Sequence, residues 1–167
     1  MIFMFFTDTC FWTHSKLITD KQIYDFRNLL EKFEFGITPQ IIKELNHYLP
    51  DYLPLEKFFH KPINDQNIQA AQKRNPFLSN FDVADQSLFT TGLLFEDVII
   101  NDDRELLAEC VQFKITAFHM GDFVLLLISQ DIIEKRIGSR IFKVLLEQNI
   151  IPNKLFKILN KRLQDLK

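Results

Sequence analysis

The segment Val98-Ile99-Ile100-Asn101-Asp102-Asp103-Arg104-Glu105-Leu106 joins a short apolar run to a polar turn and the beginning of a helix. A short, continuous apolar run bounded by turn residues is typical of a strand buried on both faces of a sheet. The N-terminal segment repeats this arrangement, because residues 2–7 form an apolar run that Thr7-Asp8-Thr9 breaks. Two such strands predict a parallel sheet covered by helices.

The rest of the chain alternates predicted strands with predicted helices. Apolar residues recur at helical spacing over 21–33, and Thr38-Pro39 supplies a capping residue and a first-turn proline for another helix. The predicted strands are 2–7, 33–37, 98–101 and 114–118, and His119-Met120-Gly121 is a predicted turn. The predicted helices are 21–33, one from Pro39, 81–94, 103–110, 123–128, 131–148 and 152–166. Around residues 49–66 we expect short helices and loops. We therefore expect one domain over residues 1–167, a three-layer α/β/α fold with a central, mostly parallel sheet of four or five strands.

The composition is that of a soluble globular protein. The chain has 167 residues, of which 47% are hydrophobic and 25% charged. Two cysteines form neither a disulfide framework nor a zinc signature, and no run of about 18 apolar residues is present, so we expect a cytoplasmic protein with no membrane contact. The glycine-rich phosphate loops of dinucleotide-binding and P-loop proteins are absent.

The charge is unevenly distributed along the chain. Residues 131–167 contain nine Lys and Arg against four acidic residues, whereas residues 1–130 are net acidic. We expect 131–167 to be a basic helical extension packed on the domain, able to hold a polyanionic backbone. The alternative for each of these residues is an ordinary solvated helix face.

Four acidic residues, Asp8, Glu44, Asp85 and Asp103, follow predicted strands or lie on predicted helices. The carboxyl ends of parallel strands face one crevice, so these side chains are expected to gather there. Carboxylates in one crevice repel each other unless a cation lies between them, and Mg²⁺ and Mn²⁺ prefer oxygen ligands. The pattern predicts a metal site.

The ordered segments resemble the PIN-domain ribonucleases, a family that includes the VapC-type toxins of toxin–antitoxin pairs. The resemblance rests on Asp8-Thr9, Ile42-Lys43-Glu44-Leu45, Ala84-Asp85 and 98–106, with 113–118 and Gly121-Asp122-Phe123 resembling the last strand and its following turn. It covers roughly residues 1–130. It implies a PIN-like fold, cleavage of RNA with Mg²⁺ or Mn²⁺, a homodimer, and an antitoxin or other protein partner.

The resemblance also implies roles for individual residues. Asp8, Glu44, Asp85 and Asp103 match the four catalytic, metal-binding acids. Thr9 matches a hydroxyl that helps to orient a metal-bound water. The family's fourth acid ends a pattern of Thr, a polar residue and Asp, and here Asn101 replaces the Thr while Asp102 fills the middle position.

Several alternatives stay open at this stage. Asp82 rivals Asp85 as the third acid, and Asp102 rivals Asp103 as the fourth, with one of the last two capping the following helix. Arg104 contacts phosphate or is a surface charge. Phe11 and Trp12 stack on a base or pack under a helix. Cys10 is expected to pack, and the four histidines, His14, His47, His60 and His119, lack zinc-site spacing.

The predicted function is that of a metal-dependent endoribonuclease, either a toxin or an RNA-processing enzyme. The alternative is a catalytically silent PIN-like module that binds RNA or protein. A phosphatase of the haloacid dehalogenase type is set aside, because the second Asp of its DxD motif is missing after Asp8.

Overall fold

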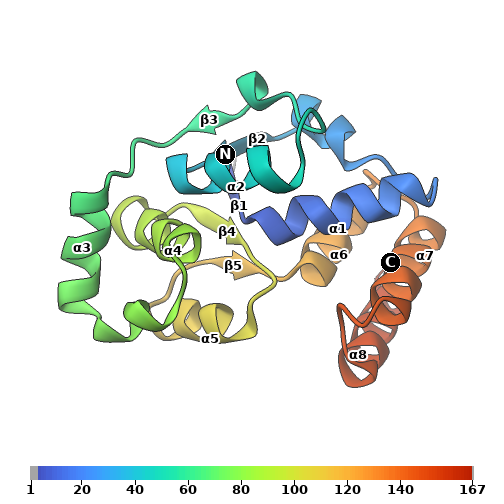
Figure 1. Cartoon of the computed structure of the whole chain (residues 1–167). Coiled ribbons are helices and arrows are strands. Elements are labelled where there is room, and N and C mark those ends of the chain that lie inside the picture. Colours follow the sequence, from blue (N-terminus) through green and yellow to red (C-terminus); the bar gives the residue numbers. More distant parts are fainter. Residues whose placement is uncertain (1–3, 167) are drawn as a thin grey trace.

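The computed structural model describes residues 4–166 and places a five-stranded sheet between layers of helices (Figure 1). The strands are β1 (Met4–Thr7), β2 (Glu34–Ile37), β3 (Phe59–His60), β4 (Val98–Ile100) and β5 (Ala117–Phe118). All neighbouring pairs are parallel, in the order β3-β2-β1-β4-β5. The predicted α/β fold with a parallel central sheet is therefore confirmed. The edge strand β3 was not predicted, β5 is shorter than predicted, and residues 2 and 3 of the first predicted strand lie outside the described residues.

The helices alternate with the strands. They are α1 (Thr9–Asp20), α2 (Pro39–Tyr48), α3 (Asp65–Arg74), α4 (Val83–Phe95), α5 (Arg104–Gln112), α6 (Met120–Ser129), α7 (Lys135–Glu147) and α8 (Asn153–Asp165), with short 3-10 helices η1 (Phe26–Glu31), η2 (Leu55–Lys57) and η3 (Pro76–Asn80). Because β2 and β3 extend the sheet on one side of β1 while β4 and β5 extend it on the other, the order of the strands switches sides at the β1/β4 pair. Ligands of open α/β sheets bind at such a switch point.

The helix predicted over 21–33 is wrong, and the helix in this part of the chain is α1, which begins at Thr9. Asp8 caps α1 by accepting a hydrogen bond from the backbone N–H of Phe11. The helix ends at Asp20, and Gln22 takes a positive φ of 53°, which an α-helix does not allow. In this segment Phe26 and Leu29 of η1 are fully buried, whereas Ile23, Leu30 and Phe33 are partly buried against the same core. The predicted turn at 119–121 is also wrong, since Met120 and Gly121 open α6 after the capping residue His119.

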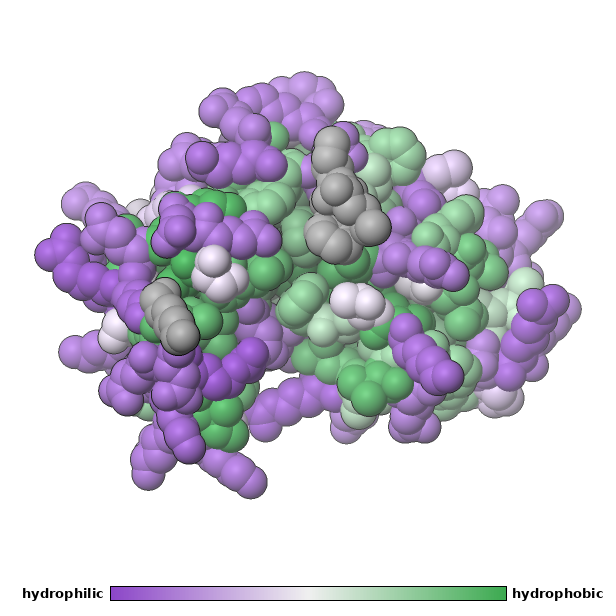
Figure 2. All heavy atoms as spheres, turned by 180° about the vertical axis from the view of Figure 1, so that it is seen from behind, coloured by the Kyte–Doolittle hydropathy of each residue, from purple (hydrophilic) through white to green (hydrophobic). Residues whose placement is uncertain are grey.

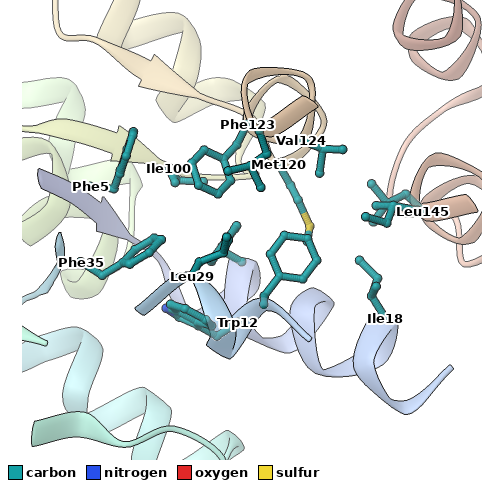
Figure 3. Close-up of a cluster of buried hydrophobic side chains, with 14 of the residues drawn as sticks. Phe5, Trp12, Ile18, Leu29, Phe35, Ile100, Met120, Phe123, Val124 and Leu145 are labelled. Carbon is teal, nitrogen blue, oxygen red and sulfur yellow. The ribbon is translucent and has the colours of Figure 1, made fainter. Parts of the chain in front are cut away.

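Alternate strand residues point to opposite faces of the sheet and enter two hydrophobic clusters. Phe5 and Ile100 belong to the larger cluster, which α1, α6, α7 and α8 cover. Phe6 and Ile99 belong to the smaller one, which α3, α4 and α5 cover. Figure 3 shows the larger cluster, where aromatic side chains from the sheet meet Trp12 of α1 and Phe123 of α6. The many Phe residues thus build the core that fixes α1 against β1.

The two C-terminal helices share this core. Ile141, Phe142 and Leu145 of α7 and Leu159 and Leu163 of α8 are buried in the larger cluster, and α7 contacts α1. Their charged residues face outward, so hydrophilic side chains dominate this end of the surface (Figure 2). Within residues 4–166, no helix combines the length and the apolarity needed to cross a membrane.

Candidate functional site

A cavity of about 370 Å³ lies at the carboxyl ends of the central strands. Its lining comes from the β1–α1 junction, α2, the start of α4, the β4–α5 turn and the loop before α8: Asp8, Thr9, Cys10, His14, Ile41, Glu44, Asp82, Ala84, Asp85, Asp102, Asp103 and Ile150. The four acids predicted from the sequence are all among these residues. Their elements are far apart in the chain, and the parallel sheet brings them together.

Asp8 is fixed at the floor of the cavity. Its carboxylate caps α1 through the N–H of Phe11 at 2.6 Å and also accepts from the N–H of Asp102 at 3.2 Å. The residue is only 5% exposed. Burial, followed by the charge of Asp102, raises the pKa of Asp8 well above its usual value, although the two backbone hydrogen bonds oppose this.

Glu44 reaches the cavity from α2. The hydroxyl of Thr9 donates to Glu44 Oε2 at 2.5 Å, which ties α2 to the beginning of α1. Thr38 positions α2 itself, because its hydroxyl accepts from the N–H of Ile41 and Pro39 occupies the first turn, as the sequence predicted. The hydroxyl of Thr9 therefore orients an acid rather than standing free in the cavity.

Asp85 and Asp82 lie one turn apart at the start of α4. Asp82 is exposed and caps the helix by accepting from the N–H of Asp85 at 2.8 Å. Asp85 points to the β4–α5 turn, where the amide of Asn101 donates to its Oδ1 at 2.8 Å. Burial, and next the charge of Asp82, raise the pKa of Asp85 to about 6, with further contributions from Asp103 and Glu44 and an opposing one from Asn101.

Asp103 and Asp102 point in different directions, which separates the two rivals for the fourth acid. Asp103 is exposed and caps α5, since its Oδ1 accepts from the N–H groups of Glu105 and Leu106 at 2.8 and 2.9 Å. Asn101 is fully buried, and its Oδ1 accepts from the N–H of Asp103 at 2.5 Å. Asn101 therefore links the third and fourth acids. In the family that the sequence resembles, a Thr occupies this position.

The carboxylate of Asp102 points toward two histidines, His14 and His119, a contact that the sequence did not reveal. His14 Nδ1 lies 2.6 Å from Asp102 Oδ2, and His119 Nε2 lies 3.4 Å from Asp102 Oδ1. The N–H of Met120 donates to Oδ1 at 2.9 Å. Burial alone would raise the pKa of Asp102, but the hydrogen bond from His14 and the two histidines lower it. No spacing motif joins these residues, because His14 precedes Asp102 by 88 positions.

The donor chemistry of the cavity suits a hard divalent cation, since carboxylates dominate its lining and Lys and Arg do not contribute to it. The side chains are not gathered around one ion position. Within the described residues, no group of three or more His, Cys, Asp and Glu is arranged to hold a metal ion. Each acid is instead held by its own hydrogen bonds at the cavity wall.

Other residues singled out in the sequence have simpler roles. Phe11 and Trp12 are fully buried, so of the two alternatives the packing role holds and stacking on a base is excluded. Cys10 was expected to pack but is exposed at the cavity; partial desolvation of its thiol, followed by the charge of Asp8, raises its pKa to about 12. The thiol is therefore protonated near neutral pH. Arg104 is exposed on the first turn of α5.

No protein-family model and no curated protein sequence matches the chain.

Proposed function

We propose that the protein is a metal-dependent endoribonuclease of the PIN-domain type, which hydrolyses RNA phosphodiester bonds at the acidic cavity. The observation that carries this proposal is the convergence of Asp8, Glu44, Asp85 and Asp103 on one cavity at the switch point of the sheet. The choice of RNA as substrate rests on the sequence resemblance.

The uncompensated negative charge of the cavity supports a cation as its cofactor. Burial is the first cause of the raised pKa values of Asp8 and Asp85, and the charges of neighbouring carboxylates add to both shifts. A divalent cation among these groups would remove the repulsion and favour their ionised forms. Mg²⁺ keeps several of its waters and takes few carboxylates directly, so the acids need not converge on one point before binding.

Each acid has a role that its surroundings support. Asp8 and Asp103 would be the central ligands, because both are anchored by backbone N–H groups at the two innermost strand ends. Glu44 and Asp85 would hold a second ion or orient its waters, with Thr9 and Asn101 fixing one oxygen of each. The bound ion would activate a water for attack and neutralise charge at phosphorus.

The biological setting belongs to the same proposal. A cytoplasmic protein that acts as a toxin with an antitoxin partner, or as an RNA-processing enzyme, would use the same cavity. A homodimer would be compatible with the apolar side chains left exposed away from the cavity, among them Phe59, Phe95 and Val111.

The test is cleavage of a mixed set of labelled RNAs in Mn²⁺, in Mg²⁺ and in EDTA. Asp8→Asn and Asp103→Asn remove a charge but keep a side chain that caps a helix well, so both variants should fold and fail to cleave. Asp25→Asn is the matched control, because Asp25 caps η1 outside the cavity. We expect cleavage by the wild type and by this control, and only with metal.

A different result would favour the silent binding module. The nuclease proposal is wrong if two results are found together. The folded wild type cleaves no RNA in either metal, and calorimetry shows either no Mn²⁺ binding or only binding that persists in Asp103→Asn. Mn²⁺ binding without cleavage would instead leave the metal site standing and direct the search to a different substrate.

A further inference from the structure

His14 is the basic side chain of an otherwise acidic cavity. It lies on α1 one turn after Cys10, and both residues line the cavity. Its side chain is 20% exposed, and its Nδ1 makes the 2.6 Å contact with Asp102 Oδ2. Among the described residues, none forms a hydrogen bond with the other ring nitrogen, Nε2. The imidazole is thus anchored on one side and open on the other.

The anchor is rigid and negatively charged. Asp102 is 7% exposed, its Oδ1 accepts from the N–H of Met120, and its Oδ2 makes the contact with His14. His119 contributes to its position: its Nδ1 accepts from the N–H of Gly121 at 3.0 Å, which leaves the proton on the Nε2 that faces Asp102. A carboxylate beside Nδ1 fixes the orientation and the tautomer of an imidazole.

The proposed hydrolysis needs a group with this property. A bound cation would activate the attacking water, but the departing ribose oxygen would still have to gain a proton. The acids of the cavity would be poor proton donors with a cation bound, and His14 is the basic side chain among the lining residues that can carry a proton.

We propose that His14 is the general acid of the reaction and that Asp102 is its positioning residue, an inference that rests on the proposed nuclease function. The water oxygen forms a bond to phosphorus, the bond from phosphorus to the leaving ribose oxygen breaks, and that oxygen takes the proton from His14 Nε2. One proton of the attacking water goes to solvent, the other stays on the new phosphate group, and His14 regains from solvent the proton that it gave.

The test compares two leaving groups. A ribonucleoside phosphodiester with a p-nitrophenyl leaving group departs as a stable anion and needs no acid, whereas RNA does. For His14→Gln we expect RNA cleavage to fall about 10²- to 10⁴-fold, the usual contribution of a general acid. Cleavage of the nitrophenyl ester should fall less than about tenfold by the same reasoning. Asp102→Asn should show the same selectivity in weaker form, and the exposed His47→Gln should match the wild type on both substrates.

One measurement needs no variant to fold. Nitrogen NMR of the imidazole should show Nδ1 protonated and Nε2 exchanging with solvent. Equal losses on both substrates in His14→Gln, or no loss on RNA while Asp103→Asn is inactive, would overturn the role of His14 and leave the nuclease intact. A wild type that cleaves neither substrate would remove the nuclease and this inference together.

Discussion

The amide of Asn101 donates to Asp85 Oδ1 at 2.8 Å, and so joins the β4–α5 turn to the start of α4. Asn101 is fully buried, and its own oxygen accepts from the N–H of Asp103. For Asn101→Ala we expect a loss of about 1–3 kcal/mol in the free energy of unfolding, because the N–H of Asp103 is left without its partner.

The same substitution should raise the pKa of Asp85 further, since the hydrogen bond from Asn101 lowers it. Carbon NMR of the Asp85 carboxyl group measures this, and urea unfolding measures the stability. Asn101→Thr, which restores the residue that the sequence resemblance expects, is the comparison. An unchanged pKa in Asn101→Ala would show that the amide does not act on Asp85.

The titration of Asp85 should make the protein less stable as the pH rises. Its pKa is about 6 in the folded chain against 3.8 for the free group, so the folded state binds more protons between these values. The free energy of unfolding must then fall as the pH rises through this window. Asp8, with its raised pKa, acts in the same direction. The contribution of Asp85 is at most about 3 kcal/mol, since one unit corresponds to about 1.4 kcal/mol.

Urea unfolding in EDTA between pH 4.5 and 7.5 measures this dependence. Asp85→Asn should flatten it. Asp82→Asn keeps a good helix cap but removes a repelling charge, so it should flatten the dependence in part. If the free energy of unfolding changes between pH 4.5 and 7.5 by the same amount in the wild type and in Asp85→Asn, the raised pKa of Asp85 is contradicted.

Thr7 and Trp12 connect the end of β1 to α1 through a buried hydrogen bond, in which Trp12 Nε1 donates to Thr7 Oγ1 at 2.8 Å. Both side chains are fully buried. Thr7→Val should cost about 1–3 kcal/mol, because the indole N–H loses its partner in an apolar environment. A double-mutant cycle with Trp12→Phe measures the pair. If Thr7→Val costs the same in the wild-type chain as in the chain that already carries Trp12→Phe, the hydrogen bond makes no contribution.

The sequence predicted those features that are encoded locally. The apolar runs that became β1, β2 and β4 and the Thr38-Pro39 start of α2 have short-range signals, and the structure confirms them. The helix α1 was missed because Asp8 was considered as a metal ligand and not as a helix cap, although its carboxylate caps the helix. The apolar spacing of 21–33 suits a 3-10 turn as well as an α-helix, and only the tertiary packing decides between them.

The candidate site divides in the same way. The four acids could be named because each follows a recognisable strand or lies on a recognisable helix, and the structure places them around one cavity. The contacts of Asp102 with His14 and His119 could not be predicted. They join α1, the β4–α5 turn and the cap of α6, and their meeting depends on the order of strands in the sheet.

Gly36 lies in β2 directly opposite Phe6 of β1, and a Cβ there would collide with the Phe6 ring. Phe6 is fully buried between the sheet and α4, so the ring has little room to move. Gly36→Ala should therefore lower the free energy of unfolding by about 1–3 kcal/mol. Gly138→Ala in α7 is the matched comparison, because its Cβ would meet the flexible end of Ile128 and alanine favours the helix. We expect Gly138→Ala to lower the free energy of unfolding less than Gly36→Ala does. Thermal unfolding of both variants measures the difference, and Gly36→Ala is also combined with Phe6→Leu. Rescue of Gly36→Ala by Phe6→Leu identifies the ring as the cause, and its absence would exclude it.

We expect the outward face of α7 to bind the RNA backbone, a prediction that rests on the proposed nuclease function. Arg136 and Arg140 are exposed one turn apart, and Ile150, from the loop that follows α7, lines the acidic cavity. Each phosphate contact releases counterions, so the loss of two such contacts should weaken RNA binding and reduce the slope of affinity against salt concentration by about 1–2.

The test variant carries both Arg136→Ala and Arg140→Ala. Lys73→Ala with Arg74→Ala is the control of equal charge, since both residues are exposed at the end of α3, away from the cavity lining. Both double variants are made in the Asp103→Asn background, which should bind RNA without cleaving it. Fluorescence anisotropy with a labelled RNA at several salt concentrations then gives the slope for each. Equal slopes for the two double variants would mean that α7 contributes only its charge and not a path for the backbone.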